Sequence, residues 1–392
     1  MNKLFLTVNL LLLAVSSLCA QQIKGVILER GTKNPIPYAT VKLKVNQIVI
    51  VANANGEFIV QNSVIKVDTL EISSLGFITL KVLLSSLSIK PLNTFELEES
   101  TNTLEEVVVK PVKITSILNE AFRKSDSAYN SPVLLKGYYR EFVKRDSFLT
   151  KYADGLVSYL ITKKGKGWPK IDLYVEESRA KILPVPEEED KFNDMNSPLS
   201  IEKMGEFANP ARPFITDSSN YKNYVFKLIE VEGQDKSIYV ISFEPAFASN
   251  KTIYHGKIYI DRDKMLILGF DYSMAPISAS YFRKISLLGI TVAVTSGIFS
   301  CRYQVENNFY NLSYVSKDFG LKISSKRWNQ MSYFKSEFFV NKIETKDLKP
   351  IGDDYNKKAL YKRGNNYKTE FWKNKNVTSN TKEETEFLLK GN

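Results

Sequence analysis

Residues 39–45 set the strongest constraint on the fold, because polar and apolar side chains alternate there with a period of two. Thr40, Lys42 and Lys44 fall on one side of an extended chain, and the apolar residues next to them fall on the other. A strand with one apolar face needs partner strands and a shared core. Similar short runs recur roughly every 8 to 12 residues between residues 23 and 98, which is typical of a β-sandwich.

Turn residues mark where these strands end. Residues 31–35 predict a turn, and Asn55-Gly56 predicts a tight hairpin, because this pair tolerates a positive φ. The segment holds about seven strands, which can close into two packed sheets. Residues 21–98 are therefore predicted to form a seven-stranded β-sandwich within a mainly β protein.

Four stretches of this segment carry a family resemblance: Gly25-Val26, the run NPIPYATV at 34–41, Asn55-Gly56-Glu57-Phe58, and the run ISSLGF at 72–77. In that order they resemble the carboxypeptidase regulatory-like domain, a transthyretin-like sandwich common in exported Bacteroidetes proteins. Asn53 departs from the family, which usually has Thr or Ser followed by Asp before the hairpin glycine, and this argues against a cation there. The domain is an appendage of carboxypeptidases, so the resemblance implies no peptidase activity.

The N-terminus predicts a secretory signal peptide over residues 1–20. Lys3 supplies the positive charge, an apolar run follows over 4–15, and small residues lead to a cleavage site after Ala20. An uncleaved anchor helix is the first alternative, but the run is short of the ~20 residues that a bilayer span needs. Lipidation of Cys19 is the second, although a lipobox has a small residue where this chain has Leu18.

Composition narrows the class further. Cleavage would leave Cys301 as the single cysteine, so no intramolecular disulfide can form and the fold depends on its core. The chain has 23 Phe and 21 Tyr, and this high aromatic content favours β structure. A net charge of +11, spread along the chain, suits an anionic membrane surface or an acidic glycan. With no binding motif for it, we predict no nucleic-acid partner.

Residues 99–113 are predicted to be a linker. The run LEEVVV at 104–109 resembles the segment that joins this domain to the plug of TonB-dependent outer-membrane receptors. Such a barrel needs about 22 strands of ~9–11 residues. The remaining chain is too short for that and lacks the even spacing, so a receptor barrel is excluded.

Residues 114–350 are predicted to form a larger α+β domain. Residues 114–128 place apolar side chains on one stripe of a helix, at Ile117, Leu118, Ala121 and Phe122. Strands are predicted at 137–145, 148–160, 224–231, 238–243, 254–260, 266–272, 285–300, 308–315, 321–331 and 337–343. Joined by short turns, they predict a curved antiparallel meander sheet with one or two packed helices. The uncharged run 285–301 is interpreted as strand–turn–strand rather than a membrane span.

This part of the chain also carries a resemblance, through Ala121-Phe122, the run YNSP at 129–132, GYYRE at 137–141, GKIYID at 256–261 and Phe371-Trp372. It resembles the remainder of a family of exported Bacteroidetes proteins that begin with the same regulatory-like domain. The resemblance implies a periplasmic or outer-membrane-associated protein without an established activity. The hairpin at 256–261 is also similar to the half-barrel lipoprotein carriers, in which a curved sheet wraps a helix and holds acyl chains.

Two charged loops and a polar tail remain. Residues 163–168 form a basic loop with Trp168, which is either a solvated turn, the interpretation we favour, or a phosphate-headgroup site. The acidic loop at 187–190 has no EF-hand spacing, so solvation is favoured over calcium. Residues 351–392 are predicted to be a polar C-terminal tail whose last twenty residues are mostly disordered.

The residue types needed for common catalytic sites are scarce. His255 is the only histidine, it falls in a predicted strand, and there is no Gly-x-Ser-x-Gly motif. One histidine excludes a zinc carboxypeptidase, and one mature cysteine excludes a cysteine-cluster zinc site. Cys301 is predicted to be a buried small side chain. We predict no catalytic, cofactor or metal site, and the sequence singles out no ligand-binding residue.

The sequence thus predicts a non-catalytic binding or scaffold protein of the cell envelope, exported to the periplasm or associated with the outer membrane. Its sandwich would dock an envelope partner, and its curved sheet would hold an apolar or glycan ligand, with peripheral contact to the outer membrane. The alternative is a glycan hydrolase that uses paired carboxylates, because Asp and Glu are plentiful.

Overall fold

The computed structural model describes residues 22–45, 48–61, 67–87, 91–99, 114–129, 131–162, 169–184, 197–210, 218–229, 238–250, 253–287, 289–306, 309–326, 329–363, 371–372, 375 and 377–389. The predicted signal peptide with Cys19, the LEEVVV run and both charged loops lie outside these residues. The chain divides into two compact units. The first is residues 1–99 with 369–383, and the second is residues 100–368 with 384–392.

The first unit is a sandwich of two sheets, as predicted. One sheet has the order β4 (Glu57–Val60), β1 (Ile23–Glu29), β7 (Asn93–Leu97), and the other has β3 (Ile48–Val51), β2 (Thr40–Leu43), β5 (Thr69–Ser73), β6 (Leu80–Leu83). Buried side chains from both sheets, such as Phe58 and Phe95 against Val41 and Ile72, form one core. The alternation in residues 39–45 is therefore the mark of a strand with one face in that core.

Asn53 stabilises the hairpin turn through its side chain. The buried Asn53 side chain accepts hydrogen bonds from the backbone N–H groups of Asn55 and Glu57, at 2.9 and 3.0 Å. Its amide donates to the Glu57 carboxylate at 2.8 Å. Gly56 follows with a φ of 72°, in the left-handed region that the hairpin requires. The Asn53 oxygen thus holds the turn through the backbone.

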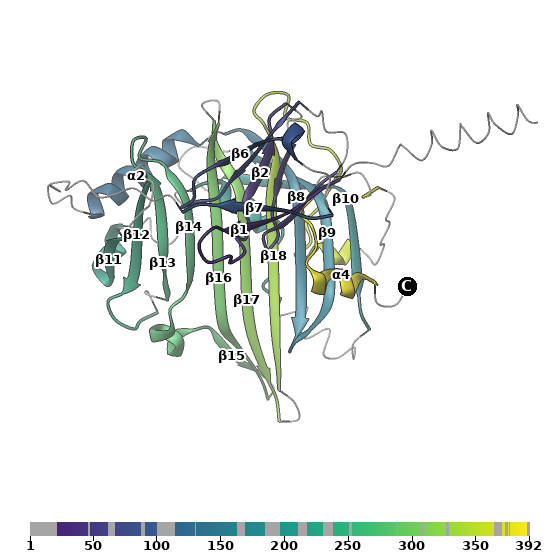
Figure 1. Ribbon diagram of the computed structural model, residues 1–392. Coiled ribbons are helices and arrows are strands. Elements are labelled where there is room, and N and C mark those ends of the chain that lie inside the picture. The colour runs from purple at the N-terminus through teal and green to yellow at the C-terminus, as the bar shows by residue number, and fades with distance from the viewer. Residues whose placement is uncertain are drawn as a thin grey trace, which may run out of the picture. The chain divides into compact units, whose positions relative to one another are not determined.

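The second unit is built on one curved, antiparallel, twelve-stranded sheet (Figure 1). Its strands are β8 (Val133–Arg145), β9 (Phe148–Thr162), β10 (Lys170–Ile182), β11 (Tyr224–Ile229), β12 (Ile238–Pro245), β13 (Tyr254–Asp261), β14 (Ile267–Met274), β15 (Lys284–Leu287), β16 (Ile290–Glu306), β17 (Phe309–Ser324), β18 (Asn329–Glu344) and β19 (Asp353–Asp354). The order is β11-β12-β13-β14-β16-β17-β18-β8-β9-β10-β19, and β15 pairs with β16. The long strand β18 therefore pairs with β8, which is the first strand of the unit. This curved antiparallel sheet confirms the predicted fold class.

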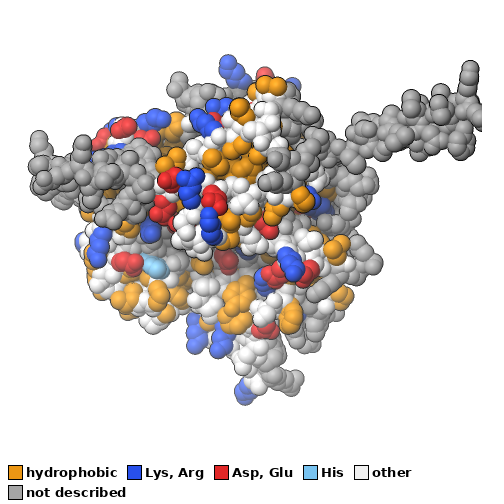
Figure 2. Space-filling view, in the orientation of Figure 1, with side chains coloured by type: hydrophobic (Ala, Val, Ile, Leu, Met, Phe, Trp, Pro, Cys, Tyr) orange, Lys and Arg blue, Asp and Glu red, His pale blue; other side chains and the backbone are white. Residues whose placement is uncertain are grey.

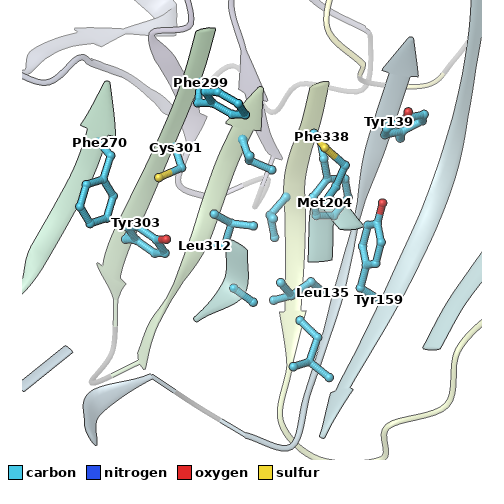
Figure 3. Packing of buried hydrophobic residues seen from close by; sticks show 14 of the residues in the cluster. Leu135, Tyr139, Tyr159, Met204, Phe270, Phe299, Cys301, Tyr303, Leu312 and Phe338 are labelled. Carbon is cyan, nitrogen blue, oxygen red and sulfur yellow. The ribbon is translucent and has the colours of Figure 1, made fainter. Parts of the chain in front are cut away.

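Helix α2 (Ile114–Ala128) defines the two faces of this sheet. Its predicted stripe is buried in the large core, where Phe122 stacks on Phe270 of β14 with ring centroids 6.2 Å apart. Figure 3 shows part of this core, with Tyr303 of β16 next to Leu312 of β17 and Phe338 farther across the sheet beside Met204. We call the α2-facing side of the sheet the inner face and the other side the outer face. The short helices η3 (Glu202–Ala208), η5 (Ser218–Asn223) and η7 (Leu360–Arg363) also contribute residues to this core.

Two strand predictions are corrected. The predicted strand at 321–331 is wrong, because β17 ends at Ser324 and β18 begins at Asn329. The turn between these strands contains no glycine or proline. The pattern of polar and apolar residues therefore continues without a break from β17 to β18. Strand β10 is not among the predicted strands, because charged side chains at its outer-face positions obscure its apolar pattern. Arg179, one of these charged residues, pairs with Asp154 on the neighbouring strand β9.

The prediction of a mostly disordered C-terminus is also wrong, because residues 382–389 form helix α4 (Lys382–Leu389). Phe387 and Leu388 are buried against Phe142 and Tyr152 on the outer face. The average polarity of the tail hid this adjacent apolar pair. None of the described helices is both long and apolar enough to cross a bilayer. The interpretation of residues 285–301 as strand–turn–strand is confirmed by β15 and β16.

Candidate functional site

Four aromatic side chains form a continuous wall on the inner face, one from each of four neighbouring strands. Tyr254, Tyr272, Phe299 and Phe319 have successive ring centroids 5.5, 4.7 and 5.2 Å apart. Tyr272 and Phe299 are buried, whereas Tyr254 and Phe319 at the two ends are half-buried. Offset and edge-on ring packing of this kind makes a stiff apolar surface. We call these four residues the aromatic wall.

The inner face continues beyond the wall as an apolar rim on β16, formed by Ile290, Val292 and Val294. All three are half-buried, and Val292 and Val294 pack against the core. Across the strands, Val292 is in register with the buried Ile323 of β17. The inner face therefore ends in partly exposed apolar side chains. Such a surface, continuous with a core, is what an apolar ligand uses for binding.

Lys317 places a cation at the other end of this surface. It lies two residues before Phe319 on β17 and points to the same face, with its ammonium 5.1 Å from the ring centroid of Phe207. The side chain is half-buried, and desolvation lowers its pKa to about 8. Lys317 and Ile323 are six residues apart along an extended strand, which is about 20 Å. The inner face thus offers a charged end, an aromatic wall and an aliphatic rim in one line.

Glu141 is a buried acid on the inner face. One of its oxygens accepts a hydrogen bond from Tyr139 at 2.7 Å, and the other accepts one from the Tyr361 backbone at 2.9 Å. Burial raises its pKa to about 7, against the lowering effect of those hydrogen bonds. A shifted pKa marks a candidate catalytic acid. Here, however, the carboxyl is 0% exposed, so it is closed off within the core.

Two ionic clusters lie on the outer face. The buried Asp154 accepts hydrogen bonds from Arg179 at 2.6 and 2.8 Å and from the hydroxyls of Tyr138 and Tyr152, both at 2.7 Å. All four donors converge on one carboxylate. This cluster joins β8, β9 and β10, so its role is to fix those strands.

The second cluster centres on Arg140 and Glu337, which are buried side by side on β8 and β18. Arg140 Nε donates to Glu337 at 2.6 Å, Tyr314 donates to the same carboxylate at 3.1 Å, and Glu384 of α4 lies 3.4 Å from the guanidinium. Burial alone would raise the pKa of Glu337, but Arg140 and Lys335 together lower it to about 2. The negative charge of the buried Glu337 is therefore stabilised by these partners.

His255, the only histidine, has both ring nitrogens engaged at the outer face (Figure 2, pale blue). Nδ1 is 3.3 Å from Glu244 of β12, and Nε2 is 2.8 Å from the Ser273 hydroxyl of β14. This acid–histidine–serine connectivity is that of a hydrolase triad. The sequence did not reveal it, because the partners lie 11 and 18 residues away and meet only through strand register.

The backbone around Ser273 does not complete such a triad. Ser273 is in register with His255 on one side and with Ile298 on the other, so its N–H lies within a hydrogen-bonded ladder. A hydrolase needs backbone or side-chain donors free to receive an oxyanion. The geometry therefore favours a polar surface contact across three strands.

Cys301 lies on the inner face and is buried, as predicted (Figure 3). Burial raises the pKa of its thiol to about 12, so it packs as a small apolar side chain. Among the described residues there is no group of three His, Cys, Asp or Glu side chains that could hold a metal ion.

Comparisons with known proteins identify the first unit. Residues 23–109 match the model of the CarboxypepD_reg-like domain, which confirms the N-terminal resemblance. No curated protein matches the chain.

Solved structures give distant likenesses to the chain. A LolA-superfamily protein, NE2245 from Nitrosomonas europaea, is 12% identical, covers 61% of this chain and 96% of its own, and has a TM-score of 0.22. A protein of unknown function from Bacteroides fragilis is 9% identical, with coverages of 83% and 99% and a TM-score of 0.16. Likenesses at these TM-scores do not establish a shared fold.

Proposed function

We propose that this chain is a non-catalytic binding protein of the cell envelope, whose second unit holds an apolar ligand with an anionic end. The ligand lies on the inner face, with its tail on the apolar rim and aromatic wall and its anion at Lys317. The observation that carries the proposal is the partly exposed apolar surface that continues the core between Lys317 and Val292.

The dimensions and chemistry of this surface suit a long acyl chain. About 20 Å of extended strand separates Lys317 from the residue opposite Val292, which is comparable to the length of a fatty acyl chain. Each methylene taken from water contributes about 0.8 kcal/mol. An ammonium with a pKa of about 8 is largely charged at neutral pH, so it can pair with a carboxylate or phosphate.

Lys317 provides the sharpest test of this ligand. Lys317→Met should weaken the binding of a fluorescent fatty acid about tenfold and leave the binding of the matching fatty alcohol unchanged, because only the acid carries the charge. Lys322→Met is the matched control, since Lys322 is exposed and lies on the outer face of the same strand. Fluorescence titration of both probes measures the effect. Equal losses for acid and alcohol would contradict a head-group role.

The first unit is proposed to dock an envelope partner. It exposes large apolar side chains at Val45, Ile78 and Leu83, and Leu83 lies on β6, an edge strand of its sheet. The proposal of an envelope location rests on the predicted signal peptide and on the exported proteins that the sequence resembles.

A glycan hydrolase is less well supported. Such an enzyme needs two carboxyl groups, one with a raised pKa and one with a lowered pKa, on either side of the bond that it cleaves. Glu141 and Glu337 have pKa values shifted in opposite directions and come from neighbouring strands. They lie on opposite faces of the sheet, however, because Glu141 is in register with Ser336 and Glu337 with Arg140. One substrate cannot reach both.

We also expect Ser273 to be unreactive. The full chain, treated with a fluorophosphonate probe, should remain unlabelled at Ser273, because the backbone N–H of Ser273 lies within the strand ladder and is not free to receive an oxyanion. Mass spectrometry of the digested protein checks this. Labelling that Ser273→Ala and His255→Gln both abolish would overturn the non-catalytic proposal.

A further inference from the structure

The β15–β16 hairpin carries the inner face out beyond the apolar rim. Ile285 is in register with Val292, and Leu287 with Ile290, so both β15 residues point to the inner side. Yet Ile285 is 45% and Leu287 69% exposed, in contrast to the half-buried rim. Gly289, with a φ of 76° and open space around it, forms the turn. The hairpin therefore ends in exposed aliphatic side chains.

Lysines lie behind this apolar tip on the opposite side of the hairpin. Lys284 and Lys322 are in register on either side of Ala293, which places them about 10 Å apart across two strand spacings. Both are exposed. Lys284 is three residues from Leu287, so the lysine row lies about 10 Å along the strand from the tip.

The segments of chain that form this hairpin and the adjoining β17–β18 turn carry no acidic residue. No Asp or Glu occurs between Asp271 and Glu306, or between Asp318 and Glu337. The neighbouring Asp146, in the β8–β9 turn, accepts a hydrogen bond from the Met331 backbone N–H at 3.1 Å. Arg283 and Lys326 are also exposed and add positive charge at this end of the sheet. Within the described ranges, these four cations form no ion pair with a carboxylate. Figure 2 shows lysine and arginine side chains gathered at the level of β15.

We infer that the β15–β16 hairpin docks the protein on an anionic lipid bilayer. Leu287 and Ile285 enter the boundary between head groups and acyl chains, and Lys284 and Lys322 contact the phosphates above them. The spacing of about 10 Å between tip and lysine row fits the 5–10 Å depth of interfacial insertion. These unpaired cations match the negative surface potential of an anionic bilayer. This contact adjoins the tail end of the proposed ligand surface, because Ile285 and Leu287 are in register with Val292 and Ile290 of the rim, whereas Lys317 lies at the other end.

Vesicle co-sedimentation of the mature chain tests the inference. The protein should pellet with phosphatidylcholine vesicles that contain phosphatidylglycerol, much less with phosphatidylcholine alone, and less as salt rises. Ile285→Asn with Leu287→Asn, and separately Lys284→Glu with Lys322→Glu, should each weaken binding about tenfold or more. Circular dichroism confirms that each variant is folded, which is expected for exposed edge positions.

Matched controls come from strands β11 and β13 of the same sheet. Val225→Asn removes an exposed apolar side chain on β11, and Lys227→Glu with Lys257→Glu reverses two exposed charges. Neither should change vesicle binding. Wild-type protein that stays in the supernatant, or equal losses in the controls, would overturn the inference. So would a dimer that Ile285→Asn with Leu287→Asn dissociates, because β15 would then be a protein-pairing edge.

Discussion

Glu337→Gln is expected to lower the free energy of unfolding by about 3–5 kcal/mol at pH 7. The substitution keeps the shape of the side chain but leaves the buried Arg140 without the carboxylate that it contacts at 2.6 Å. Because the pKa of Glu337 is lowered to about 2, its contribution is present above pH 4.5 and is lost as the pH falls through 2. Urea denaturation at several pH values measures both effects.

Glu344→Gln is the matched control on the same strand. Glu344 pairs with Lys136 and Lys342 near the surface, so its loss should cost less than about 1 kcal/mol. A double variant, Arg140→Leu with Glu337→Leu, should recover most of the stability, because it removes both buried charges. A cost for Glu337→Gln no larger than that of Glu344→Gln would contradict a tightly coupled buried pair.

Glu141→Gln is expected to have the opposite effect and to stabilise the protein at pH 8, by up to about 3 kcal/mol. Burial raises the pKa of Glu141 from 4.5 to about 7, so the native state binds this proton more tightly than the unfolded chain does. Stability is therefore lost as the pH rises from about 4.5 to 7. The amide of Gln cannot ionise, and the variant avoids this loss.

The gain should disappear near pH 4, where Glu141 is protonated in both states. Glu120→Gln, on the exposed side of α2, should change stability by no more than about 0.5 kcal/mol at either pH. Denaturation curves at pH 4 and 8 give the comparison. If Glu141→Gln destabilised the protein at pH 8 more than at pH 4, its carboxyl would be needed in ionised form by Tyr139 and Tyr361.

Much of the fold could be predicted because apolar periodicity reports burial directly. The alternation at 39–45 and the stripe on α2 each identified a face that the structure buries. Two elements were not predicted, and for the same reason. Strand β10 and helix α4 contain charged residues whose partners, such as Asp154 for Arg179 and Arg140 for Glu384, are distant in sequence.

The candidate site was less predictable. Its residues are ordinary apolar and basic types, and what distinguishes them is exposure and register. Phe319 and Lys317 share a face with Val292 only because β17 pairs with β16. The contact of His255 with Ser273 and Glu244 arises in the same way. A single sequence does not specify which strands become neighbours.

Native mass spectrometry of the protein, purified from its own cells, tests the central claim most directly. We expect an added mass of a molecule with an acyl chain and an anionic end, which is retained in Lys257→Met, an exposed lysine of β13, and reduced in Lys317→Met. Protein that is repeatedly free of any ligand, and that cleaves a glycan, would contradict the binding function.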